Sequence, residues 1–185
     1  NAVICSKEMC FALMGISIND TLLDIIVNDM IQKTVEINNC ACSAIISNPL
    51  SDYLKLADTY QKLKEGFHIR MIRKQQWQCI FLDELQYDRI MLHISKDTEV
   101  HQFIRCKLGP LVEYDRAHDT QLLETLEALI QNHNSRKLAA ESLFLHRNTM
   151  VHRINKIEEV LHCSLDDTEI MEQLEFAIKM KMYAH

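Results

Sequence analysis

The 185-residue sequence predicts an α+β amino-terminal half followed by an all-helical carboxyl-terminal domain. Short apolar runs alternate with two long helical segments as far as residue 85, and from residue 86 onwards the hydrophobic periodicity is helical throughout. Only three glycines and two prolines occur, which is typical of a compact chain with little irregular structure. We therefore expect an α+β domain over residues 1–94, a helical joint over 95–118 and a helical domain over 119–185.

In the amino-terminal half, apolar runs bounded by polar or turn-forming residues predict strands. Asn19 or Asp20 can cap a first helix, Ser51 or Asp52 can start a second, and Gly66 should end the second. The predicted strands are residues 3–5, 10–16, 44–47, 68–72 and 79–82, the first two forming a hairpin. The apolar sides of the two helices are Leu22, Ile25, Ile26, Met30 and Val35, and Leu54, Leu56, Ala57, Tyr60 and Leu63.

In the carboxyl-terminal half, Gly109-Pro110 predicts a joint between helices, and Asp119 is the expected cap of the helix that follows. Asn132-His133-Asn134 should end that helix, and Asp166-Asp167 should cap the last one. The predicted helices are residues 86–94, 97–107, 119–130, 135–143, 147–161 and 166–183, with one further turn at 111–114.

Several classes of protein are disfavoured by the composition. No run of 18 apolar residues and no basic-then-apolar leader occurs, so we expect a cytoplasmic chain without a membrane segment. The seven cysteines form no C-x-x-C pair and are expected to be free buried thiols. His146 and His152 are spaced six apart, which does not suit zinc, and no nucleotide-loop or nucleophile motif appears. We therefore expect no catalytic residues, cofactor or metal.

Charge is distributed unevenly along the chain. The net charge is −6, but residues 131–157 hold five Lys or Arg and a single acid, Glu141, which makes this window +4 and the remainder −10. A local basic face on an acidic chain is a suitable footprint for phosphates, because contact depends on the surface presented.

That basic window has the pattern of a helix-turn-helix, from Asn134 to about Leu161. Ala139 and Ala140 supply small residues where two helices cross, and Leu143 and Leu145 bring the turn into the core. Met150, Ile154, Ile157 and Leu161 form an inward stripe at i, i+4, i+7 and i+11.

The polar residues of this window suit the major groove. Arg can grip guanine, Asn can grip adenine, and Lys or Thr can serve phosphates or base edges. We expect Arg147, Asn148, His152 and Arg153 to face bases, and Arg136, Lys137, Thr149 and Lys156 to lie nearer phosphate. Ser135 at the start of the first helix and His146 at the start of the second complete the candidate DNA-binding set.

Periodicity alone leaves an alternative open, namely an ordinary amphipathic helix pair with a solvated basic face. Many such turns also carry Gly, which tolerates positive φ, whereas Phe144 stands near that place here.

A family resemblance narrows this choice. Over about residues 105–180 the chain resembles the carboxyl-terminal helix-turn-helix domain of PucR/CdaR regulators, which control purine catabolism and sugar-diacid use. The matching residues are Leu122-Leu123, Thr125-Leu126, Asn134, Ala139-Ala140, Leu143, His146-Arg147-Asn148-Thr149-Met150 and Arg153. Family members also lack the Gly of the turn, so Phe144 agrees with the resemblance.

The amino-terminal half is more loosely similar to the degenerate GGDEF-like domain, a ferredoxin-like α/β sandwich, of the same regulators. In an active diguanylate cyclase the hairpin tip carries two glycines and acids, whereas residues 6–9 here are Ser-Lys-Glu-Met. We therefore expect no cyclase activity.

The resemblance implies a bacterial transcription regulator that binds double-stranded operator DNA as a homodimer. It also implies a small-molecule effector, sensed by a region upstream of this fragment. Two alternatives remain at this point: a nucleotide-turnover enzyme of the GGDEF type, and a helical protein-interaction module.

Overall fold

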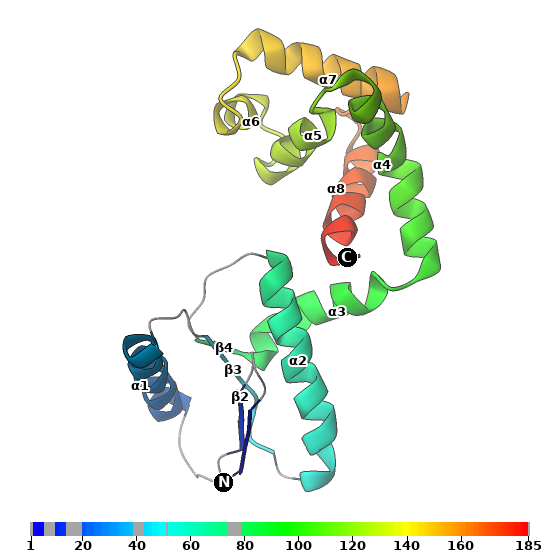
Figure 1. The fold of residues 1–185 in the computed structure, drawn as a ribbon. Coiled ribbons are helices and arrows are strands. Elements are labelled where there is room, and N and C mark those ends of the chain that lie inside the picture. The colour runs from blue at the N-terminus through cyan, green and yellow to red at the C-terminus, as the bar shows by residue number, and fades with distance from the viewer. Residues whose placement is uncertain are drawn as a thin grey trace. The chain divides into compact units, whose positions relative to one another are not determined.

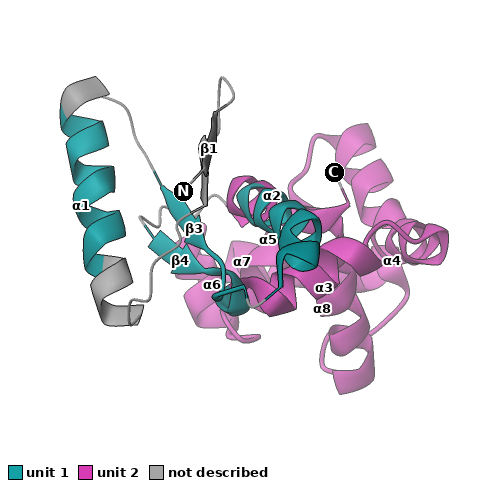
Figure 2. Cartoon of the chain, turned by 90° about the horizontal axis from the view of Figure 1, so that it is seen from below, with its two compact units in different colours: residues 1–67, 75–84 teal, residues 68–74, 85–185 magenta. Residues whose placement is uncertain are grey.

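The computed structural model describes residues 2–5, 10–13, 20–38, 43–50, 52–73 and 79–184. The chain divides into two compact units, Asn1–Phe67 with Gln75–Glu84 and His68–Lys74 with Leu85–His185 (Figure 2). Figure 1 shows that strands and helices share the first unit, whereas the second contains helices. No helix among the described residues is long and apolar enough to cross a membrane.

The strands of the first unit form two pairs. β1 (Ala2–Cys5) and β2 (Cys10–Leu13) pair antiparallel, which confirms the hairpin, although its tip at residues 6–9 lies outside the described residues. β3 (Ala44–Ile46) pairs in parallel with β4 (Cys79–Phe81), with Ala44 opposite Cys79. Parallel neighbours need a long crossover connection, and here that connection contains a helix.

Helix α1 (Asp20–Asn38) begins at the predicted cap, but its buried side is narrower than predicted. Ile31 is buried, whereas Ile25, Met30 and Val35 are exposed, so the predicted inward set is wrong at those three positions. Helix α1 contacts β4, a strand of three residues.

Helix α2 (Leu56–Arg73), which follows a short 3-10 turn η1 (Tyr53–Lys55), continues past Gly66. The predicted stop at Gly66 and the predicted strand at 68–72 are therefore wrong. A helical Gly costs about 1 kcal/mol, and Ile69, which is fully buried one turn later, stabilises the extended helix by about 2 kcal/mol. Leu63 is buried as predicted, whereas Leu54 and Ala57 are exposed, so the predicted inward set is wrong at those two positions.

The main part of the second unit starts at Leu85, the last residue of η2 (Leu82–Leu85), and α3 (Gln86–Ile94) follows with the predicted bounds. Helix α4 (Thr98–His118) is continuous, so the predicted joint at Gly109-Pro110 is wrong. Pro110 is exposed on α4, while Leu108 and Leu111 beside it are buried in the core. Burial of these two leucines, about 2 kcal/mol each, offsets the missing Pro110 hydrogen bond.

Helix α5 (Leu122–Gln131) is capped by a residue of the preceding helix. Asp115 of α4 accepts hydrogen bonds from the backbone N–H groups of Leu122 (2.8 Å) and Leu123 (2.9 Å). The predicted cap, Asp119, instead adopts a left-handed conformation (φ 53°) and ends α4. The prediction was wrong because the capping carboxylate belongs to Asp115, which lies seven residues before Leu122 and reaches it through space.

Helices α6 (Arg136–Ser142), α7 (Arg147–Leu161) and α8 (Thr168–Tyr183) confirm the last three predicted helices. Asp167 caps α8 as predicted. The helices α4 to α8 share one core. The fully buried side chains of this core are Leu111, Leu126, Ala139, Ile154, Ile157 and Ala177.

The structure describes the side chains of Cys79, Cys106 and Cys163. Cys79 and Cys163 are partly buried, and Cys106 is exposed, so the prediction of buried thiols is wrong for Cys106.

Candidate nucleic-acid interface

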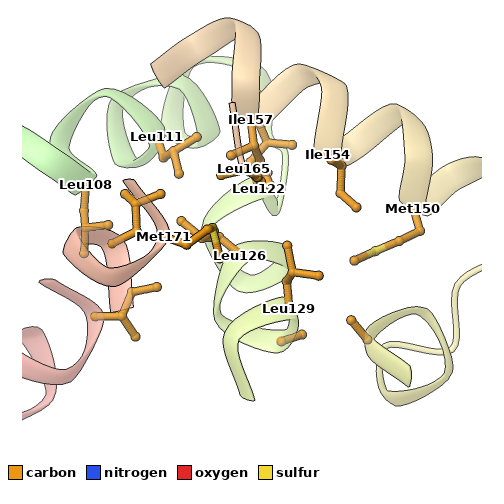
Figure 3. Packing of buried hydrophobic residues seen from close by; sticks show 14 of the residues in the cluster. Leu108, Leu111, Leu122, Leu126, Leu129, Met150, Ile154, Ile157, Leu165 and Met171 are labelled. Carbon is orange, nitrogen blue, oxygen red and sulfur yellow. The ribbon is translucent and has the colours of Figure 1, made fainter. Parts of the chain in front are cut away.

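The orientation of α7 is set by its inward stripe. Met150, Ile154 and Ile157 are at most 1% exposed. Figure 3 shows these three side chains pointing towards Leu126 and Leu129 of α5. Leu161 is partly buried against the same core, so the predicted stripe is confirmed along the whole helix. One face of α7 is thereby committed to the core and the other is left to solvent.

The α6–α7 turn has the geometry of a helix-turn-helix. Ala139 and Ala140 of α6 are buried, and Leu143 and Leu145 pack against the core, as predicted. Phe144 between those leucines has φ 55°, the left-handed conformation that Gly tolerates best. Its amide bonds the Glu141 carbonyl (3.1 Å), and its ring is 97% exposed.

At the start of α7, His146 acts as the helix cap. Its Nδ1 accepts a hydrogen bond from the backbone N–H of Asn148 (3.3 Å). The next three side chains, Arg147, Asn148 and Thr149, are exposed. The amino terminus of α7 therefore presents a cation, an amide and a hydroxyl beside the positive end of the helix dipole, which favours an approaching phosphate.

An outward row of polar side chains runs along α7 opposite the inward stripe. Asn148, His152 and Asn155 follow the spacing i, i+4, i+7, and all three are exposed. Asn155 was missed by the sequence reasoning. The same helical spacing could have found it, because Asn155 lies three residues after His152 and carries an amide suited to base edges.

Arg153 lies on the flank of α7, and its guanidinium is turned towards α5. Nη1 donates to the hydroxyl of Thr125 (3.1 Å), and Nη2 donates to the side-chain carbonyl of Gln121 (3.2 Å). Arg153 is partly buried, whereas Asn148 and His152 are exposed. The structure thus separates Arg153 from the residues with which it was predicted to read bases.

Lys156, also on α7, forms an ion pair with Glu159 and lies over the ring of Tyr114. Its ammonium lies 2.5 Å from Glu159 and 5.8 Å from the centre of the Tyr114 ring. The hydrogen bond to Glu159 raises the pKa of Lys156 and so favours its charged form. An exposed pair of this kind is weak and can be exchanged for a phosphate contact.

At the start of α6, the predicted phosphate-contact residues lie together on the surface. Ser135 caps the helix by accepting a hydrogen bond from the N–H of Leu138 (3.4 Å). Arg136 and Lys137 are both exposed, but Arg136 pairs with Asp166 (2.8 Å) in the loop before α8. Asp166 therefore offsets the charge of Arg136, one of the residues predicted to contact phosphate.

The structure offers no competing metal centre in the part of the chain that it describes. No group of three or more His, Cys, Asp or Glu side chains there is arranged to hold a metal ion. His146 is instead used as a cap, and His152 lies in the outward row.

Comparison with known proteins supports this geometry. Residues 122–180 match the family model described as the PucR C-terminal helix-turn-helix domain. The chain is 31% identical over 130 residues, 70% of its length, to the "Proline-responsive transcriptional activator PutR" of Bacillus subtilis. It is 32% identical over 91 residues, 49% of its length, to the "Purine catabolism regulatory protein" of the same organism.

A third relative is the "Carbohydrate diacid regulator" of Escherichia coli, 24% identical over 135 residues, 72% of this chain. The chain spans 32% of the first of these relatives, 17% of the second and 34% of the third. The carboxyl-terminal domain of the chain, residues 122–180, therefore belongs to the PucR-type helix-turn-helix domains, and the three relatives that the chain matches are named as an activator or regulators.

Proposed function

We propose that this chain is the DNA-binding part of a bacterial regulator, and that α6 and α7 bind double-stranded operator DNA, with α7 in the major groove. The observation that carries the proposal is the division of α7 into two faces. Its inward stripe is buried in the core, while its outward row Asn148, His152 and Asn155 is polar, exposed and aligned. A groove-reading helix needs this combination of rigid support and free polar side chains.

Within this proposal, the contacts divide by chemistry. Asn148 and Asn155 can each offer a donor and an acceptor to adenine, and Arg147 can grip guanine. Lys137 and Thr149 suit phosphates, and Arg136 joins them when it leaves Asp166. His146 contributes by capping α7, which aims the helix amino terminus.

We further propose a homodimer, since operators read by such helices are usually two-fold symmetric. The relatives are named for proline, purine catabolism and carbohydrate diacids, which supports a small metabolite as the signal. We place the effector-sensing region upstream of this chain and the whole regulator in the cytoplasm. We also propose that the first unit is related to a degenerate GGDEF-like domain and has no enzymatic activity. Its parallel β3–β4 pair supports this relationship.

The test uses a duplex selected from a random-sequence pool by the wild-type chain. Binding should weaken steeply with salt, with a slope of about −0.9 per phosphate contacted. Asn148→Ala should flatten the preference at one base pair, at a loss of about 1–3 kcal/mol.

Lys137→Ala is the matched control, and it should weaken binding to all duplexes alike, because phosphate contacts carry no sequence information. Failure of the pool to yield any preferred duplex, together with salt-independent binding, would contradict the proposal and favour a protein-interaction module. Product formed from GTP and Mg²⁺ would contradict the non-enzymatic part.

A further inference from the structure

We infer that Arg153 is a positioning residue that holds α7 against α5 at the angle required for base readout, and that it does not read bases itself. This inference rests on the proposed DNA-binding function and concerns how that interface is aimed. It changes the expectation from sequence, which grouped Arg153 with Arg147, Asn148 and His152 as base-facing.

The two acceptors of Arg153 both belong to the start of α5. Thr125 is fully buried, so no DNA group can reach its hydroxyl. That hydroxyl donates to the carbonyl of Gln121 (2.7 Å) and accepts from Arg153 (3.1 Å), so its bonds are all internal. Gln121 adds its side-chain carbonyl as the second acceptor for the guanidinium. The planar fork of Arg153 thus joins Gln121, the residue just before α5, to Thr125 in the first turn of α5.

The charge at this place is compensated locally. A cation near a helix amino terminus is ordinarily unfavourable, because the helix dipole is positive there. Here the carboxylate of Asp115 lies at the same helix end, bonded to the Leu122 and Leu123 amides. The positive charge of Arg153 is one of the causes that lower the pKa of Asp115. Residues from α4, α5 and α7 therefore form one polar contact at the edge of the core.

We infer that the hydrogen bonds of Arg153 restrict rotation of α7 about its own axis, which apolar packing restricts less. The inward stripe of α7 fixes its distance from α5, but apolar contacts are non-directional and resist rotation of the helix about its axis less strictly. A two-pronged hydrogen bond on the flank of α7 has a defined direction. Rotation of α7 would displace Asn148, His152 and Asn155 together, and a displacement of about 1 Å is enough to weaken a positioned contact strongly.

The experiment compares the wild-type 185-residue chain with Arg153→Ala, Arg153→Lys, Thr125→Val and the Arg153→Ala/Thr125→Val double variant. The probe is the duplex selected above, titrated at several salt concentrations. We expect each single variant to lose tenfold or more in affinity, with the salt slope unchanged. The double variant should bind no more weakly than the weaker single variant, because both remove one contact. Arg153→Lys keeps the charge but not the fork, so it should lose affinity as well.

Three results would overturn the inference. The first is that Thr125→Val binds the selected duplex as tightly as wild type while Arg153→Ala loses much of its affinity. Another is a salt slope reduced by about 0.9 in Arg153→Ala, which marks a phosphate contact. The last is loss of preference at a single base pair in Arg153→Ala, which marks base readout. If Thr125→Val does not fold, Arg153→Lys and the salt slope decide the question.

Unfolding of the same four variants without DNA separates this inference from the proposed function. Coupling between Arg153 and Thr125 in the free energy of unfolding is expected whether or not the chain binds DNA. If Arg153 and Thr125 are coupled in unfolding but no preferred duplex is selected, the proposed DNA-binding function alone is refuted. If a preferred duplex is selected but the two residues are not coupled, the positioning role of Arg153 alone is refuted.

Discussion

The phenolic hydroxyl of Tyr183 donates a hydrogen bond to the carboxylate of Asp88, 95 positions earlier in the chain. Asp88 is 1% exposed, and Arg73 Nε lies 2.6 Å from the same oxygen. The end of α8 is thus joined to α3 and to the end of α2 by one buried carboxylate. Asp88→Ala should lower the free energy of unfolding by about 3 kcal/mol, because it leaves two donors without their buried acceptor. Chemical denaturation of both proteins measures this, and an unchanged midpoint would contradict it.

Alkaline unfolding should report the same contact. Burial and the hydrogen bond to Asp88 raise the pKa of Tyr183 from 10.0 to about 12. The neutral phenol is therefore favoured in the fold, and its contribution to stability is complete below pH 10 and lost as the pH rises towards 12. Tyr183→Phe lacks this titration, so the difference in stability between wild type and Tyr183→Phe should shrink over that range. A difference that stays constant from pH 9 to pH 12 would contradict the assignment.

Asp115 should contribute to stability in the opposite pH range. Burial alone would raise its pKa, but hydrogen bonds from Leu123, Thr120 and Leu122, with the charge of Arg153, lower it overall. The stabilisation is present above the ordinary value of 3.8 and is lost as the pH falls through the lowered pKa.

Asp115→Asn should therefore be less stable by about 1 kcal/mol at pH 7, as for loss of a helix cap. It should also lose less stability than wild type on acidification below pH 4. Asp119→Asn is the matched control, since Asp119 ends α4 and does not cap α5. A larger effect at Asp119 than at Asp115 would restore the cap predicted from sequence.

Phe144→Gly should leave the fold as stable as wild type or raise its stability by up to about 1 kcal/mol. The left-handed conformation costs a side-chain-bearing residue about 1–2 kcal/mol, and the greater unfolded-state entropy of Gly offsets part of that gain. Little burial is lost, because the ring is 97% exposed. Phe144→Ala keeps the Cβ and should show no gain, so thermal melts of the two variants separate strain from side-chain loss. A melting temperature lowered more by Gly than by Ala would contradict this.

Asp166→Asn should strengthen DNA binding a few-fold, because it frees Arg136 for a phosphate. Its effect on the free energy of unfolding should stay within about 0.5 kcal/mol, since the pair is exposed. Glu172→Gln on α8 removes an equal charge from an exposed residue and serves as the control. Equal gains in both variants would show that net charge, and not release of Arg136, is responsible.

The helix-turn-helix could be predicted almost to the residue, whereas α2 and α4 could not. The bounds of α7, the buried Ala139 and Ala140 and the cap at Asp167 follow from residues within about four positions of one another. Gly66 and Pro110 are local stop signals too, but burial of Ile69, Leu108 and Leu111 outweighed them. That burial depends on neighbours that no local pattern names.

By itself, the sequence determined that α7 has one apolar and one polar face, and its resemblance to a known domain directed that polar face to DNA. Only the tertiary structure decided which polar side chains remain free. It placed Arg153 on Thr125 and Gln121, 28 and 32 positions away, and left Asn155 in the outward row. The physical reason is that helical periodicity reports the angle of a side chain around its own axis, whereas a hydrogen-bond partner depends on which helix packs beside it.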